Sequence, residues 1–203
     1  MMEVPESDLY WTLKGEGEGF YKEKGSKFLA FAYPVTSAEE IKACQEALRK
    51  QYYDARHHCY AWRLGPAGER LRANDDGEPN HSAGDPILGQ LKSADLTDAL
   101  VIVIRYFGGT KLGVSGLIHA YRTAAAEALE KAPRIQKTVS TPLHLRYPYD
   151  RTQEVMRLVD EYPVAMTGQE FAADCQMTLE VPRSLHARVQ EAVEKIPDVA
   201  VLD

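Results

Sequence analysis

The last third of the chain shows the clearer pattern of apolar and polar positions. Stretches with the period of a strand and stretches with the period of a helix alternate there, each of normal length. They predict a strand, a helix, two strands, a helix and a short strand at residues 136–147, 150–162, 164–172, 175–182, 184–196 and 198–203. The second helix has Ser184 as a possible cap. The order β-α-β-β-α-β predicts a ferredoxin-like domain over residues 135–203.

The first two thirds are less regular but also mix strands and helices. We expect a hairpin over 17–35 with a glycine turn near Gly25, and a helix from 37 opened by a capping box of Ser37 and Glu40. Further strands and helices are expected at 57–64, 84–94, 99–107 and 115–132. Strand 99–107 is apolar without alternation, which is typical of a strand covered on both faces. Pro133 ends the last helix, so the first domain is expected to span residues 1–134.

Charge and cysteine content narrow the classes of function. The net charge is −6; residues 1–134 carry 17 basic and 19 acidic side chains (net −2), and residues 135–203 carry 7 and 11 (net −4). Neither part is a basic module, so nucleic-acid binding would need a local patch. Three scattered cysteines argue for reduced thiols rather than disulfides. Without an apolar signal or a membrane-length segment, we expect a cytoplasmic protein that has no membrane partner.

The loop RYFGGTKLG, residues 105–113, lies between the apolar strand and the alanine-rich helix. Gly108, Gly109 and Gly113 would leave backbone amides open to an anion, beside Lys111 and the positive end of the helix dipole. Ser115 would cap that helix, and Arg105 and Arg122 would add positive charge. The spacing is neither that of a Walker A loop nor GxGxxG, so a plain glycine turn is the alternative.

Two further stretches carry chemically active side chains. Residues 73–86 gather Asp75, Asp76 and Glu78 around Gly77, a set that could bind Mg²⁺, serve as acid and base, or form only a solvated acidic turn.

In HHCYAW, residues 57–62, His57 shares a strand face with Cys59, and His58 lies on the other face. These residue types suit a zinc or thiolate site, but no metal-ligand spacing is met, and a buried core thiol is the alternative.

Taken together, HHCYAWRLG, DDGEPNHSAGDPIL and ALVIVIRYFGGTKLGVSGLIHAY resemble the signature of the IMPACT family, in its bacterial YigZ-like branch. The motifs span residues 57–121, and the flanks agree in length and order. One departure is the segment Asn80, His81 and Ser82, where family members more often have a Gly-Thr pair in place of His81 and Ser82.

The resemblance implies an α+β protein of two domains. The first would be similar to domain 2 of ribosomal protein S5, a fold shared with the GHMP kinases. The ferredoxin-like second domain would resemble a domain of elongation factor G. The family is linked to regulation of translation, its bacterial members have been suggested to bind nucleic acid, and it has no established reaction or cofactor.

Three functions follow from these observations. The first is a non-enzymatic, translation-associated regulator that binds RNA or the ribosome, without DNA sequence specificity, or a protein of the translation machinery. Its surface would comprise His57, His58, Asp75, Asp76, Gly77, Glu78, Arg105, Tyr106, Gly108, Gly109, Lys111, Gly113 and Arg122. The second is a nucleotide-binding or small-molecule enzyme that uses the acidic turn. The third is a regulator that contacts only proteins.

Overall fold

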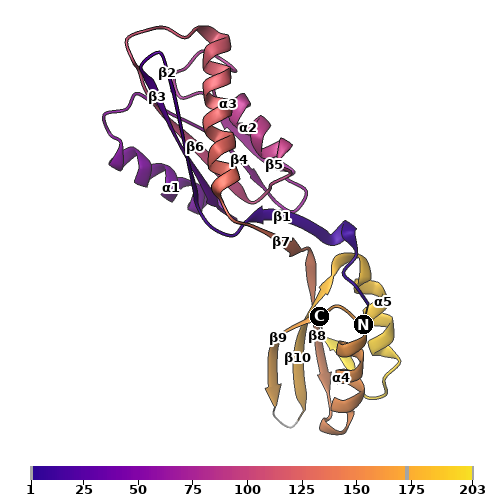
Figure 1. Ribbon diagram of the computed structural model, residues 1–203. Helices are drawn as coiled ribbons and strands as arrows, with labels where there is room; N and C mark the ends of the chain where they lie inside the picture. Colours follow the sequence, from indigo (N-terminus) through magenta and orange to yellow (C-terminus); the bar gives the residue numbers. More distant parts are fainter. Residues whose placement is uncertain (1, 172–173, 203) are drawn as a thin grey trace. The chain divides into compact units, whose positions relative to one another are not determined.

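A computed structural model describes residues 2–171 and 174–202 of the chain. The chain folds into two compact units. One comprises Tyr10–Gln136, and the other comprises Met1–Leu9 together with Lys137–Asp203. Both units combine antiparallel sheets with helices, so the mixed α and β class expected from the sequence is confirmed (Figure 1).

The larger unit is built on a five-stranded antiparallel sheet of order β2-β3-β6-β4-β5. Its strands are β2 (Gly17–Glu23), β3 (Ser26–Pro34), β4 (His57–Leu64), β5 (Arg70–Asn74) and β6 (Ala99–Tyr106). The helices of this unit are α1 (Ala38–Gln51), α2 (Gly84–Ser93) and α3 (Gly113–Lys131). The central strand β6 is buried from Ala99 to Arg105, as its unbroken apolar run predicts.

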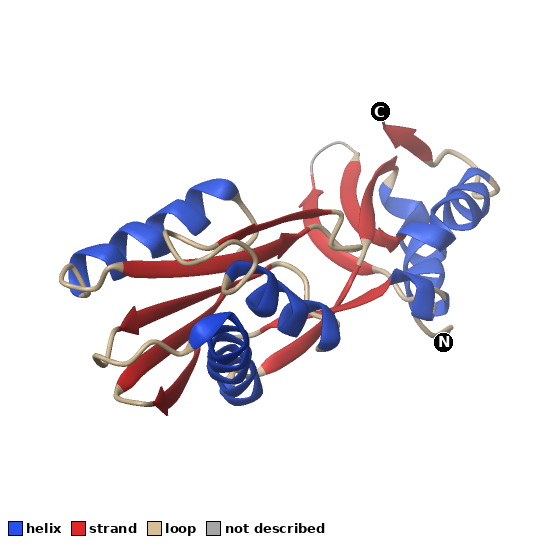
Figure 2. Ribbon diagram, turned by 90° about the horizontal axis from the view of Figure 1, so that it is seen from above, coloured by secondary structure: helices blue, strands red, loops and turns tan. Residues whose placement is uncertain are grey.

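Helices cover the two faces of this sheet differently (Figures 1 and 2). Helix α1 buries Ile41 and Leu48 against Leu100, Ile102 and Ile104. Helices α2 and α3 cover the other face, where alanines allow close packing. Gly17 and Gly19 lie so near the backbone of α3 that an added Cβ would come within 2.2 and 2.4 Å of carbonyl oxygens. These β2 glycines therefore let α3 approach the edge strand.

Several local predictions are confirmed, and two strands were missed. Gly25 takes a left-handed φ of 81° in the β2–β3 turn, and the Ser37 hydroxyl accepts a hydrogen bond from the Glu40 amide at 3.2 Å. The missed strands are β5 and β1 (Leu9–Leu13); β1 pairs with β7 (Arg134–Thr138). Strand β5 has three exposed residues, two of them arginines, at a sheet edge, so its sequence lacks the apolar signal of a strand.

The smaller unit has a four-stranded antiparallel sheet of order β11-β8-β10-β9. Its elements follow as β8 (Ser140–Tyr147), α4 (Thr152–Glu161), β9 (Ala165–Phe171), β10 (Cys175–Pro182), α5 (His186–Glu194) and β11 (Ala200–Leu202), with short 3₁₀ turns at Tyr149–Arg151 and Arg183–Leu185. This is the predicted element order β-α-β-β-α-β. One sheet face packs on Val155, Leu158, Val189 and Val193 of the helices.

The N-terminal residues fold with the smaller unit, which differs from the expected division into residues 1–134 and 135–203. A 3₁₀ turn, Glu6–Asp8, precedes β1. The Asp8 carboxylate accepts hydrogen bonds from the amide and hydroxyl of Ser184 at 3.0 and 2.6 Å. Ser184 is therefore not the side-chain cap predicted for α5; it lies in the 3₁₀ turn before that helix and binds Asp8 instead.

Candidate nucleic-acid interface

The three motif stretches meet in space within the larger unit. Strand β4 pairs with β6, which sets His57 opposite Arg105 and Cys59 opposite Val103. The turn that holds Asp76 and Gly77 folds back onto the start of β4, because the Asp76 carbonyl oxygen lies 2.9 Å from His57 Nδ1. The joint appearance of the motifs in sequence therefore reflects direct contact.

The acidic turn, residues 75–78, has two residues in the left-handed backbone conformation and is closed by a backbone hydrogen bond. Asp76 and Gly77 have φ of 41° and 86°, and the Glu78 amide donates to the Asp75 carbonyl at 2.9 Å. Asp76 and Gly77 thus form a turn that leads from β5 into the loop before α2. Asp76 accepts from the His58 amide at 2.7 Å and pairs with Arg49 at 3.0 Å.

The Asp75 carboxylate caps helix α2. It accepts hydrogen bonds from the backbone amides of His81, Ala83 and Gly84 at 2.8–2.9 Å. Burial acts to raise the pKa of Asp75, but these three donors outweigh it and lower the pKa below its usual range. Asp75 therefore stabilises the start of α2 and has little capacity left for a metal or a partner.

Glu78 lies in a buried network that joins the other two motifs. One carboxylate oxygen accepts from Arg105 Nη1 at 2.6 Å and from the Tyr121 hydroxyl at 2.7 Å. The side chains of Arg105 and Glu78 are only 7% and 3% exposed. Arg105 also lies 5.6 Å from the ring centroids of Phe28 and Phe107. The expectation that Arg105 and Glu78 face a partner across an open surface is therefore corrected, since they neutralise each other inside the domain.

Cys59 is a core thiol. Its Sγ lies within hydrogen-bond distance of the Asp75 carbonyl oxygen (3.0 Å) and the Tyr121 hydroxyl (3.3 Å), and burial raises the pKa of Cys59. A high thiol pKa leaves almost no thiolate to act as a nucleophile or metal ligand. Within residues 2–171 and 174–202, no group of three or more His, Cys, Asp or Glu side chains is arranged to hold a metal ion. His58 is buried, and burial together with the neighbouring Arg49 lowers its pKa.

The structure explains why glycine is required at positions 108, 109 and 113 of the loop. Gly108 packs against the β2–β3 turn, where an added Cβ would lie 1.9 Å from the Gly25 carbonyl carbon, and its amide donates to Ser26 Oγ at 3.1 Å. Gly109 and Gly113 have φ of 89° and 73°, which side chains other than glycine rarely adopt. The glycines therefore shape the loop, and they leave its solvent side open.

Helix α3 begins without a side-chain cap. The capping position is Leu112, and Ser115, predicted as the cap, lies inside the first turn and does not bind the helix amides. No acidic residue stands in that turn. Exposed Lys111 precedes it, so the start of α3 is an uncompensated positive end.

A set of cations missed in the sequence gathers at this same end of the sheet, where β2 turns into β3, β4 begins and β6 ends (Figure 1). All are exposed, and none forms an ion pair in the part of the chain that the structure describes. We call them the basic end: Lys22, Lys24, Lys27, Arg56 and Lys111. The cluster KEKGSK at the hairpin turn was the available signal in the sequence.

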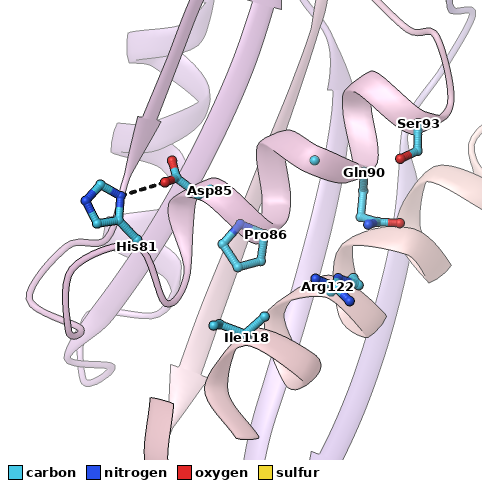
Figure 3. A pocket seen from close by; sticks show the side chains of 8 residues that line it. His81, Asp85, Pro86, Gln90, Ser93, Ile118 and Arg122 are labelled. Carbon is cyan, nitrogen blue, oxygen red and sulfur yellow. Dashed lines mark hydrogen bonds and ion pairs between the residues drawn. The ribbon is translucent and has the colours of Figure 1, made fainter. Parts of the chain in front are cut away.

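Arg122 lies apart from this group. Figure 3 shows it in a groove between α2 and α3, which also contains His81, Asp85, Gln90 and Ser93 and has a volume of about 530 Å³. His81 Nδ1 lies 2.6 Å from the Asp85 carboxylate. Arg122 is about three helical turns from Lys111 along α3, so the structure does not bring it to the loop as expected.

Comparison with known proteins identifies the family of the chain. The family model described as the Impact N-terminal domain matches residues 24–129. The chain belongs to the IMPACT family. It is 31% identical to the IMPACT family member YigZ of Escherichia coli over 86% of this chain and 85% of that one. It is 35% identical to YvyE of Bacillus subtilis over 69% of this chain and 64% of that one.

A solved crystal structure of a hypothetical protein is similar to the whole IMPACT-family chain. The identity is 27%, the match covers 96% of this chain and 97% of the other, and the TM-score is 0.69. The departure at His81 also has a structural meaning, because this residue adopts a left-handed φ of 64°. Glycine adopts that backbone conformation more readily than residues with a Cβ do.

Proposed function

We propose that this chain is a non-enzymatic, translation-associated regulatory protein that binds RNA or the ribosome through the basic end. Membership of the IMPACT family, which is linked to regulation of translation, supports the coarser role. The finer assignment rests on the five exposed cations at one end of a sheet in a chain of net charge −6. Binding of this kind requires no metal or cofactor.

The observation that carries the proposal is a pair of like charges. Lys22 and Lys27 stand directly opposite each other on β2 and β3. Like charges in opposite positions destabilise a sheet, and no carboxylate of the described residues forms an ion pair with either lysine. An anionic partner would relieve that repulsion, and phosphates of RNA supply the matching charge.

The arrangement also removes an objection to RNA binding at this surface. The acidic turn beside it would repel phosphates if its carboxylates faced outward. Instead, Asp75 caps α2, Asp76 pairs with Arg49, and Glu78 is neutralised by Arg105. Because the three carboxylates are already engaged in these hydrogen bonds and ion pairs, they are poorly suited to act as metal ligands or as a catalytic base. This argues against the alternative of an enzyme that uses the acidic turn.

Binding of the purified protein to structured RNA and to ribosomal subunits tests the proposal. Affinity is measured at about 50 and 200 mM salt, between which phosphate contacts weaken strongly. Lys111→Ala is expected to weaken binding at low salt, and Lys50→Ala, an exposed lysine on α1, serves as the matched control. Absence of binding at low salt would refute the proposal and leave the role of a protein-only regulator.

A further inference from the structure

A pocket opens beside the basic end, at the end of the sheet where β6 ends and β4 begins. It has a volume of about 410 Å³ and is lined by Asp54, Arg56, His57, Arg105, Tyr106 and Phe107. Two chain segments meet there: residues 54–57, which lead into β4, and residues 105–107, where β6 ends. Because the paired strands β4 and β6 hold both segments, the pocket is largely preformed.

Two side chains that line this pocket have nitrogen atoms that no hydrogen bond of the described residues uses. Arg105 is more than nine-tenths buried, and its Nε has no hydrogen-bond partner among the described residues, although Nη1 binds Glu78. His57 Nδ1 lies 2.9 Å from the Asp76 carbonyl oxygen, which fixes the ring and leaves Nε2 for another group. Exposed Arg56 forms no ion pair in the described part of the chain.

The pocket also offers an aromatic face and an acceptor. Phe107 is 58% exposed, yet its ring is held beside the Arg105 guanidinium at 5.6 Å. The Tyr106 hydroxyl donates to Asp54 at 2.7 Å, and this hydrogen bond raises the pKa of Tyr106 to about 12. Only one of the two carboxylate oxygens of Asp54 is used by this bond, so the carboxylate can still accept from an amino or hydroxyl group.

We propose that this pocket takes one unpaired nucleotide of a bound RNA, with its base on Phe107 and its phosphate against Arg56. A nucleotide combines the three features that the lining requires: a flat ring, an anion, and amino or hydroxyl donors for Asp54. Base stacking on an aromatic side chain is the usual way in which proteins hold single-stranded RNA. This inference rests on the proposed function, because the basic end supplies the backbone contacts.

The smaller unit offers no such stacking surface on its two central strands. The outward positions of β8 and β10 are Pro142, His144, Arg146, Gln176, Thr178 and Glu180, and none of these is Phe, Tyr or Trp. His144 is already bonded to Thr178 at 3.0 Å. An exposed aromatic ring beside arginines is therefore a feature of the Arg105 pocket and not of these strands.

The test compares an unstructured single-stranded RNA with an RNA duplex of the same length, at low salt. Bases in a duplex are paired and cannot enter the pocket, whereas both RNAs present phosphates to the basic end. Phe107→Leu keeps an apolar side chain but removes the ring, and Phe107→Tyr keeps the ring. We expect Phe107→Leu to weaken single-strand binding roughly 5- to 100-fold. Duplex binding should stay unchanged, and Phe107→Tyr should retain wild-type affinity for both.

Thermal unfolding of each variant, compared with that of the wild type, checks that the fold is kept. Equal effects of Phe107→Leu on both RNAs, or no effect on either, would overturn the pocket assignment while leaving the basic end intact. Failure of the wild-type protein to bind either RNA would instead refute the proposed function, and the pocket assignment with it.

Discussion

Arg105 and Glu78 form a buried ion pair at 2.6 Å that fastens the acidic turn to the central strand of the larger unit. Tyr121 of α3 donates to the same carboxylate oxygen, and the Cys59 thiol of β4 lies 3.3 Å from the Tyr121 hydroxyl. Four segments that are distant in sequence therefore meet in one network. The motif that identifies the family thus acts in large part to hold the domain together.

Glu78→Gln is expected to destabilise the larger unit strongly. The substitution keeps the size of the side chain but leaves the Arg105 guanidinium buried without its counter-charge, which typically costs about 3–5 kcal/mol. Urea unfolding measures the loss. Asp85→Asn removes the exposed His81 pair and should cost less than about 1 kcal/mol. Equal losses for the two variants would show that the buried pair is not a special source of stability.

Gly108→Ala and Gly89→Ala should change stability in opposite directions. An alanine Cβ at position 108 would overlap the backbone of the β2–β3 turn, with an expected cost of about 1–3 kcal/mol or more. At position 89, inside α2, an added Cβ would meet no atom of the described residues within 4 Å apart from its chain neighbours and the nearby backbone of its own helix, so the gain in helix propensity should stabilise by up to about 1 kcal/mol. Thermal melts of both variants check this contrast; a neutral Gly108→Ala would contradict the described loop packing.

His58 should make stability depend on pH in the mildly acidic range. Burial and the neighbouring Arg49 lower its pKa in the folded state below the ordinary value of 6.5. The unfolded chain therefore binds a proton more readily, so the contribution of His58 is complete above pH 6.5 and is lost as the pH falls below that value. His58→Leu should flatten the dependence of unfolding free energy on pH in this window. An unchanged slope would show that His58 does not cause it.

Much of the fold could be predicted because its local signals agree with the tertiary structure. Three signals each predicted the structure that is observed: the unbroken apolar run of β6, the glycine at the β2–β3 turn and the Ser37 cap. Strand β5 was missed because it lies at an exposed edge of the sheet. Its sequence RLRAN buries no side chain fully and so does not show the alternation of apolar and polar residues that predicts a strand. The role of Asp8 beside Ser184 could not be predicted, since the two residues are 176 positions apart.

The candidate site was predicted only in outline. The sequence indicated which stretches gather, but not which way their side chains point. Arg105, Asp75 and Glu78 were expected on the surface, and tertiary interactions turn all three inward. The lysines around the β2–β3 turn were overlooked because a charged hairpin turn is ordinary in sequence; its meaning emerges only when Lys111 and Arg56 lie at the same end of the sheet.

The most direct test of the central claim is the salt dependence of RNA affinity in a variant of the basic end. Lys22→Ala, Lys24→Ala and Lys27→Ala are combined in one chain, and log K is plotted against log salt concentration beside the wild type. Each phosphate that the variant no longer neutralises should reduce the slope by about 0.7–0.9. We predict weaker binding and a slope shallower by about 2–3 for the triple variant. A slope and affinity equal to those of the wild type would contradict the assignment of RNA binding to this surface.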